Sequence, residues 1–122
     1  MEKFVLYRKE LLKGSTETIL LSVLSVQPMY GYQLVKEISG KSSGYLNFKE
    51  GTLYPALHRL EKDKYLTGYW DTSKNGQKRR YYKITALGQR RLVSMLSEWN
   101  EFSQAINLIA QPQLFKLTLI HI

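Results

Sequence analysis

The sequence predicts a mainly α-helical domain that carries a two-stranded β-hairpin and continues into a long C-terminal helix. Three patterns predict this class. Apolar residues recur at helical spacing over most of residues 2–64, and two β-rich stretches flank an Asn-Gly pair at residues 75–76. Heptad spacing of apolar residues follows towards the C-terminus. We therefore expect a first domain over residues 1–85 and a dimerisation helix with its tail over residues 86–122.

Three helices are expected before residue 40. Residues 2–13 form the first, and a second starts at Ser15 or Thr16 as the N-cap and runs to about residue 25. Pro28 ends that helix, and a third covers about residues 31–38. The residues expected on their inner faces are Phe4, Tyr7, Leu11 and Leu12, then Ile19, Leu20, Val23 and Leu24, then Leu34, Val35 and Ile38. Residues 40–47, rich in Gly and Ser, are expected to form a connection.

A fourth helix is expected over residues 52–64, with Leu53, Leu57 and Leu60 on its buried face. Thr52 is its expected N-cap. Pro55 would then lie in the first turn, where its missing N–H has little effect.

The hairpin is expected to have strands at residues 66–72 and 80–85, with Asn75 and Gly76 supplying the positive φ angles of a tight turn. Strand alternation places Tyr82 and Ile84 on one face of the second strand. The other face carries cations, and no acidic residue occurs from residue 74 to residue 83. The order of three helices followed by a hairpin predicts a winged helix-turn-helix with a cationic β-wing. A solvated loop of mixed charge is the alternative reading of the hairpin.

The charge of the chain favours a polyanionic partner. It has 18 Lys and Arg against 10 Asp and Glu, a formal net charge of +8, and such an excess binds phosphates with release of counterions. In a helix-turn-helix the second helix enters the major groove of double-stranded DNA. The expected DNA contacts are Gln33 and Lys36 on the preceding helix, Lys49, Thr52, Tyr54, His58, Arg59 and Lys62 on or beside the second helix, and Lys74, Lys78, Arg79 and Arg80 on the wing. The alternative is that these residues are only the solvated face of a helical core.

The long helix, expected from residue 86 to about residue 110 and ended by Gln111-Pro112, carries two interleaved heptad series. Its seam consists of Leu92, Met95, Trp99, Phe102, Ile106 and Ile109. This seam is longer than a small domain needs for its own core, so we expect a homodimer. Packing against residues 2–13 within one chain is the alternative. The apolar tail over residues 114–122 is expected to be either an extension that clasps the dimer or a disordered end.

Several classes of function find no support in the residues. There are no cysteines, and the two histidines, His58 and His121, show no metal-ligand spacing. No nucleophile and base stand at a usable spacing, so an enzyme is not expected. No apolar run reaches the length of a membrane span, and the first residues lack the apolar stretch of a signal peptide. We expect a cytoplasmic protein that uses no metal and no cofactor.

Three motifs in this order and at this spacing resemble those of the PadR-like transcriptional regulators. They are Pro28-Met29-Tyr30-Gly31-Tyr32, Glu50-Gly51-Thr52-Leu53-Tyr54-Pro55-Ala56-Leu57-His58-Arg59-Leu60-Glu61, and Arg79-Arg80-Tyr81-Tyr82-Lys83-Ile84-Thr85-Ala86-Leu87-Gly88. The resemblance covers about residues 15–109 and is to the short subgroup with one C-terminal dimerisation helix. The chain departs from the family at Lys64, where members often have Gly, so a different turn is expected before the first wing strand.

The resemblance implies a homodimer that usually represses a nearby operon, with typical targets in phenolic-acid detoxification, multidrug efflux or stress responses. In members that bind planar hydrophobic compounds, a tryptophan of the last helix lines the pore between subunits, and Trp99 matches that position by its place in the helix. Simple packing at the interface is the alternative role for Trp99. The effector, the operator and the regulated genes do not follow from the resemblance.

The resulting hypothesis is a dimeric DNA-binding regulator, a repressor relieved by a small hydrophobic or phenolic ligand and bound to a pseudo-palindromic operator. Repression and activation are not distinguished by these residues. The alternative hypothesis is a ligand-sensing or protein-interaction adaptor that kept the fold without specific reading of DNA.

Overall fold

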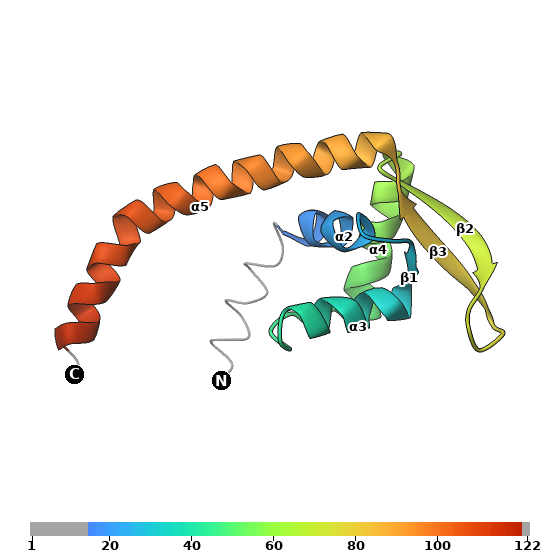
Figure 1. The fold of residues 1–122 in the computed structure, drawn as a ribbon, viewed down its shortest axis with the longest axis horizontal. Coiled ribbons are helices and arrows are strands. Elements are labelled where there is room, and N and C mark those ends of the chain that lie inside the picture. Colours follow the sequence, from blue (N-terminus) through green and yellow to red (C-terminus); the bar gives the residue numbers. More distant parts are fainter. Residues whose placement is uncertain (1–14, 121–122) are drawn as a thin grey trace. The chain divides into compact units, whose positions relative to one another are not determined.

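The computed structural model describes residues 15–120, and the helix expected over residues 2–13 lies outside the described part. The elements are α2 (Thr16–Leu24), β1 (Met29–Tyr30), α3 (Gly31–Lys41), α4 (Glu50–Lys62), β2 (Leu66–Thr72), β3 (Lys78–Ile84) and α5 (Ala86–Ile120) (Figure 1). The chain divides into two compact units, Met1–Leu92 and Val93–Ile122. The first turns of α5 thus belong to the first unit.

The core of the first unit forms where α2 meets α3, α4 and β3, and where α4 meets β2 (Figure 1). Its largest fully buried side chains are Tyr82, Leu20, Leu21, Leu24, Leu34, Leu53, Leu57 and Leu66. The inner faces expected for α2, α3 and α4 are therefore mostly confirmed, whereas Phe4, Tyr7, Leu11 and Leu12 lie outside the described residues. Ile19 and Val35, also expected inside, are only half-buried, and Leu21 is fully buried instead.

The α4 helix begins earlier than the sequence predicted, and Thr52 is not its N-cap. Lys49 is the N-cap residue, with extended backbone and no side-chain capping bond. The Lys49 carbonyl accepts the N–H groups of Thr52 and Leu53, at 3.0 and 2.9 Å, so the helix is already closed there. Pro55 consequently lies inside the helix and not in its first turn. Because proline has no N–H, the Gly51 carbonyl lacks its ordinary helical donor.

The end of α4 is a Schellman turn built on a lysine. The Tyr65 N–H donates to the Leu60 carbonyl at 2.9 Å, and the Lys64 N–H donates to the Glu61 carbonyl at 3.0 Å. Lys64 has a φ of 66°, the left-handed conformation that glycine adopts at least cost. Lys64 thus takes the left-handed position of this turn although it is not glycine.

The sheet has three antiparallel strands in the order β1-β3-β2, so the expected hairpin gains a third strand. The added strand β1 pairs Met29 with Tyr82 and Tyr30 with Tyr81. A strand of two residues is too short to show an alternating pattern in the sequence, so only its pairing with β3 defines it. At the hairpin turn Gly76 alone has a positive φ, of 83°, and Asn75 does not share it. The Ser73 N–H donates to the Gln77 carbonyl, at 2.8 Å, and this bond closes the wider loop.

The α5 helix is longer than expected. Thr85 caps its start, since the Gly88 N–H donates to the Thr85 hydroxyl oxygen at 3.0 Å. The predicted end at Gln111-Pro112 was wrong, because the helix continues past Pro112 to Ile120. A proline removes one helical hydrogen bond and strains one turn, and the residues after it here are compatible with a helix. Residues 114–120 of the apolar tail are therefore helical, and residues 121–122 lie outside the described part.

Candidate nucleic-acid interface

The α4 helix has a sharply two-sided surface. Leu53, Ala56, Leu57 and Leu60 are buried, because their spacing places them along one stripe of the helix. The predicted contact residues of this helix all lie on its exposed side, and they are Thr52, Tyr54, His58, Arg59 and Lys62. Lys49 is exposed just before the helix, and Gln33 and Lys36 are exposed on α3. The structure thus leaves the predicted set accessible to a partner.

The connection between α3 and α4, residues 42–49, is held by its own polar contacts. The Leu46 N–H donates to the Ser42 hydroxyl oxygen at 2.9 Å, and the Asn47 amide donates to the Gly44 carbonyl at 2.7 Å. Phe48 anchors the connection in the core, with 5% of its surface exposed. These contacts fix where α4 begins relative to α3, which is the geometry that a helix-turn-helix requires.

Tyr54 has a packing role beside its predicted contact role. Its ring lies against the first turn of α3, since a Cβ atom added at Gly31 would stand 2.5 Å from the Tyr54 hydroxyl. Only glycine leaves room for this approach. The Tyr54 side chain is 37% exposed, and its ring centroid lies 6.4 Å from that of His58. One edge of Tyr54 therefore sets the contact between α3 and α4, and the remainder faces outward.

On α3, an aromatic residue accompanies the predicted polar contacts. The Lys36 ammonium lies 5.1 Å from the centroid of the Tyr32 ring, and Tyr32 is 60% exposed. The Gln33 side chain accepts a hydrogen bond from the Tyr30 N–H, at 3.2 Å, and so stabilises the start of α3. Tyr32 was not among the predicted contacts. Its signal in the sequence was an aromatic residue out of phase with the buried stripe of Leu34 and Ile38.

The outer face of the sheet carries a row of three tyrosines. Tyr81 stacks on Tyr69 with ring centroids 5.8 Å apart and meets Tyr30 edge-on at 5.3 Å. Arg79 lies over the Tyr30 ring, with 5.3 Å from its guanidinium carbon to the centroid, and also contacts the Gln77 side chain. Burial, followed by the charge of neighbouring groups, raises the pKa of Tyr81. Arg79 is thus held against this aromatic row, whereas Lys74 and Lys78 are exposed near the tip of the wing.

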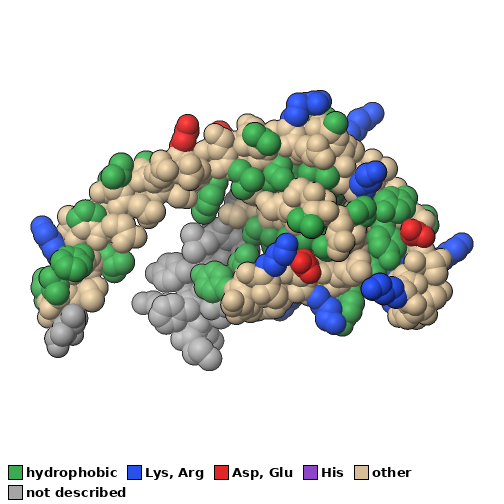
Figure 2. Space-filling model, in the orientation of Figure 1, with side chains coloured by type: hydrophobic (Ala, Val, Ile, Leu, Met, Phe, Trp, Pro, Cys, Tyr) green, Lys and Arg blue, Asp and Glu red, His purple; other side chains and the backbone are tan. Residues whose placement is uncertain are grey.

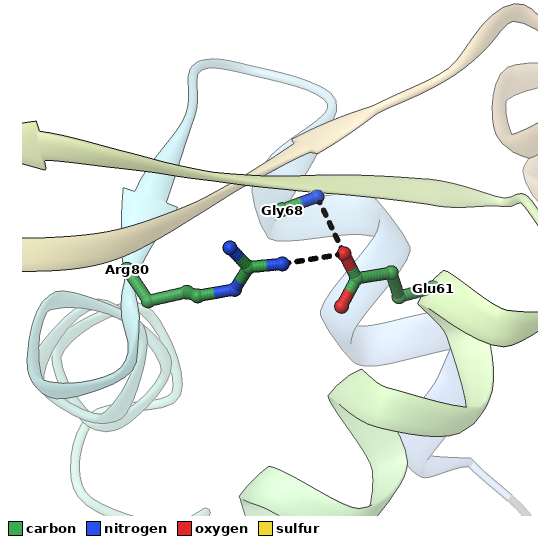
Figure 3. A network of polar contacts seen from close by, with 3 residues as sticks. All are labelled: Glu61, Gly68 and Arg80. Carbon is green, nitrogen blue, oxygen red and sulfur yellow. Dashed lines mark hydrogen bonds and ion pairs between the residues drawn. The ribbon is translucent and has the colours of Figure 1, made fainter.

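Arg80 takes a different place from the other wing cations. Its guanidinium donates to Glu61 of α4 at 2.8 Å, and the same carboxylate oxygen accepts the Gly68 N–H of β2 at 3.0 Å (Figure 3). The guanidinium carbon also lies 5.8 Å from the ring centroid of Trp70. A Cβ atom at Gly68 would stand 2.6 Å from both charged groups. Sequence reasoning missed Glu61, because nothing local indicates an ion pair between residues 19 positions apart.

The second unit, residues 93–122, exposes a long series of apolar side chains (Figure 2). Among the predicted seam residues, the exposed fractions are 55% for Trp99, 60% for Phe102, 47% for Ile106 and 73% for Ile109. Trp99 and Phe102 have ring centroids 6.4 Å apart. Leu92 differs, because it belongs to the first unit and is only 7% exposed. The exposed members of the predicted seam therefore lie beyond Leu92.

A helix-turn-helix, braced at its turn and followed by a β-wing with exposed cations, defines the class of winged helix-turn-helix proteins. The model of the PadR-like transcriptional regulator family matches residues 20–94 of this chain. The chain belongs to the PadR-like family of transcriptional regulators, and it is a regulator rather than an enzyme. Membership in this family implies binding to DNA.

Similar proteins cover most of the chain. A transcriptional regulator from Clostridium thermocellum is 35% identical, with a TM-score of 0.74, over 80% of this chain and 95% of the other. A PadR-like transcriptional regulator from Bacillus cereus is 32% identical, with a TM-score of 0.74, over 84% of this chain and 97% of the other. An uncharacterized protein from Lysinibacillus sphaericus is 34% identical over 104 residues, which are 85% of this chain and 95% of that protein.

Within residues 15–120, no helix has the length and apolar character needed to cross a membrane. The same residues contain no group of three or more His, Cys, Asp or Glu side chains that could hold a metal ion.

Proposed function

We propose that this protein is a homodimeric repressor that binds a pseudo-palindromic operator in the cytoplasm and is released by a small hydrophobic or phenolic ligand. The observation that carries the proposal is the exposed polar and basic side of α4, fixed beside a wing with exposed cations. A helix of this kind fits the major groove, and cations of a wing reach the flanking phosphates.

The proposed contacts divide by chemistry. Thr52, Tyr54 and His58 stand at the outer side of α4 and would meet base edges or the adjacent sugar–phosphate. Phosphate contacts are assigned to Arg59 and Lys62 on α4, Lys49 before it, Gln33 and Lys36 on α3, and Lys74, Lys78 and Arg79 on the wing. Arg80, the fourth cation predicted to contact DNA on the wing, is instead paired with Glu61. Since each neutralised phosphate releases counterions, the affinity should fall steeply as salt rises.

The apolar surface of the second unit supports dimerisation. Trp99, Phe102, Ile106 and Ile109 are mostly exposed along one helix, and exposed apolar surface of this extent marks an interaction site. A second copy is the proposed occupant, because the heptad spacing suits a helix–helix seam. The helical tail after Pro112, with Leu114 at 58% and Phe115 at 66% exposed, would extend this contact.

A ligand would act through the angle between the two long helices. Half-sites on DNA lie about one helical turn, ~34 Å, apart, so a modest change in the spacing of two recognition helices would weaken binding. Only a ligand that prefers one arrangement of the dimer can drive such a change. Trp99 is the proposed floor of the ligand site, since it is exposed and has Phe102 beside it.

Binding to a duplex that carries the promoter region upstream of the protein's own gene tests the core of this proposal. The duplex is titrated across a salt series beside a scrambled duplex of equal length. Tight binding that prefers the promoter duplex and has a steep salt slope is expected. Equal binding to both duplexes would contradict specific reading and would favour an adaptor that kept the fold without it.

Ligand binding can be followed by tryptophan fluorescence, because the chain has only two tryptophans, Trp70 and Trp99. The variant Trp70→Phe leaves Trp99 as the sole tryptophan reporter. Planar phenolic compounds should change its emission and weaken operator binding over the same concentration range. A fluorescence change without any change in DNA affinity would reject relief of repression by those compounds.

A further inference from the structure

The contact between Glu61, Arg80 and Gly68 joins the parts of the proposed DNA-binding surface. Glu61 lies in the last turn of α4, Gly68 in β2 and Arg80 in β3 (Figure 3). One carboxylate oxygen of Glu61 accepts the Gly68 N–H at 3.0 Å and the Arg80 guanidinium at 2.8 Å. A single side chain therefore holds both strands of the wing to the helix that faces the major groove.

The space around this contact has room for no added side chain. A Cβ atom at Gly68 would lie 2.6 Å from the Glu61 oxygen and 2.6 Å from an Arg80 nitrogen. Glu61 is 30% and Arg80 35% exposed, so the acid is less exposed than the acids, and the cation less exposed than the cations, of the other two ion pairs found among the described residues. Partial removal from water strengthens such a pair, and the second bond to a backbone N–H fixes its direction.

The positive charge of Arg80 is already paired within the protein. Glu61 contacts its guanidinium, and Trp70 lies 5.8 Å from it. Lys78, two residues earlier on the same strand, is exposed, and no ion pair involves it among residues 15–120. A cation that is already paired releases few further counterions when DNA binds, whereas a free one contributes fully to the salt slope.

We propose that Glu61 is a positioning residue for DNA binding, which acts through Arg80 and Gly68 to set the angle of the wing against α4. In this assignment Arg80 orients the wing and does not itself bind phosphate. The inference rests on the proposed function, in which α4 and the wing hold the same duplex.

For Glu61, the expected change in DNA affinity is opposite to the change that simple electrostatics predicts. Removing an acidic side chain from a DNA-binding protein ordinarily strengthens binding, because repulsion of phosphate is lost. Glu61→Gln should instead weaken binding to the promoter duplex, by roughly fivefold, since the wing loses its ion pair. Asp63→Asn is the matched control, because Asp63 is an exposed acid two residues away, at the C-cap of the same helix. It should leave the affinity unchanged or raise it slightly.

The salt dependence separates a positioning role from a phosphate contact. Lys78→Gln should lower the slope of log affinity against log salt by about 0.9, as expected for one lost phosphate contact. Arg80→Gln should reduce the affinity with little change in slope. The double variant Glu61→Gln/Arg80→Gln should bind no more weakly than the weaker single variant, because both changes break one contact.

All variants are compared at a temperature at which circular dichroism shows each to be fully folded, so loss of folded protein does not enter the affinities. If Glu61→Gln binds as tightly as Asp63→Asn, or if Arg80→Gln lowers the slope as Lys78→Gln does, the positioning role is overturned. Failure of the proposed function itself is recognised separately, because the unaltered protein would then not prefer the promoter duplex to the scrambled one.

Discussion

At the scale of single residues, Lys64 shows how tertiary context selects a backbone conformation against local preference. Its φ of 66° belongs to the region that favours glycine, yet the two Schellman hydrogen bonds at the end of α4 require it. The hydroxyl of Thr85 also donates to the Lys64 carbonyl, at 2.7 Å, and so ties this turn to the start of α5. A residue other than glycine can thus keep a left-handed backbone conformation where the surrounding hydrogen bonds fix the turn.

Lys64→Gly should stabilise the protein, because glycine adopts a positive φ without strain at Cβ. The expected gain is about 0.5–1 kcal/mol in the free energy of unfolding, somewhat less than the left-handed penalty of ~1 kcal/mol or more, because glycine loses more chain entropy on folding. Urea unfolding followed by circular dichroism measures this gain. Lys62→Gly, in the last turn of α4, is the control and should destabilise by up to ~1 kcal/mol. Equal effects of the two changes would contradict the assigned role of the turn.

At the scale of elements, the two ends of α5 differ in what surrounds them. Its first turns belong to the first unit, where Gly88 and Leu92 are buried. From Val93 onward the apolar residues are largely exposed, including Leu108 at 80%. Within the described residues, these apolar side chains bury little surface against their own chain. The proposed homodimer would explain why this part of the helix is apolar.

Ile106→Asp should convert the proposed dimer to a monomer, because a charge would be buried in the seam without a partner. Size-exclusion chromatography with light scattering measures the mass, and the dimer should be lost at micromolar concentration. Affinity for the promoter duplex should fall with it, since one of two half-site contacts is lost. Gln104→Asp, an exposed polar position of the same helix, is the control and should remain dimeric. A dimeric Ile106→Asp variant would remove this seam from the proposed interface.

At the scale of the whole molecule, stability should depend on pH through buried tyrosine. Tyr82 is 2% exposed, and burial, followed by the charge of Glu61, raises its pKa above the ordinary value of 10.0. A raised pKa in the folded state means that the folded protein holds the phenol proton more tightly than the unfolded chain. This contribution is fully present below about pH 10 and is lost as the pH rises through the folded pKa.

The free energy of unfolding should therefore decline above about pH 10, and Tyr82→Phe should decline less steeply over that range. Urea unfolding of the two proteins between pH 8 and pH 11 measures the difference in slope. Lysines that lose their charge affect both proteins alike, so their contribution cancels in the comparison. Parallel slopes would show that Tyr82 is not the group responsible.

The sequence alone predicted the elements that depend on local pattern. Helical spacing indicated α2, α3, α4 and α5, and β-rich composition with an Asn-Gly turn indicated the wing. The same periodicity separated the buried leucines of α4 from its exposed polar side. These features could be predicted because neighbours along the chain determine which face of an element is apolar. The family could be recognised for a related reason, since three motifs kept their order and spacing.

Only the tertiary structure decided the features that join distant residues. The β1 strand exists because it pairs with β3, and α4 starts at Glu50 because the Lys49 carbonyl closes the first turn. Arg80 was indistinguishable from Lys78 in the sequence, yet it meets Glu61 across two elements. Whether a charge is free or paired depends on which elements come together in space, and the spacing of residues along the chain does not contain that information.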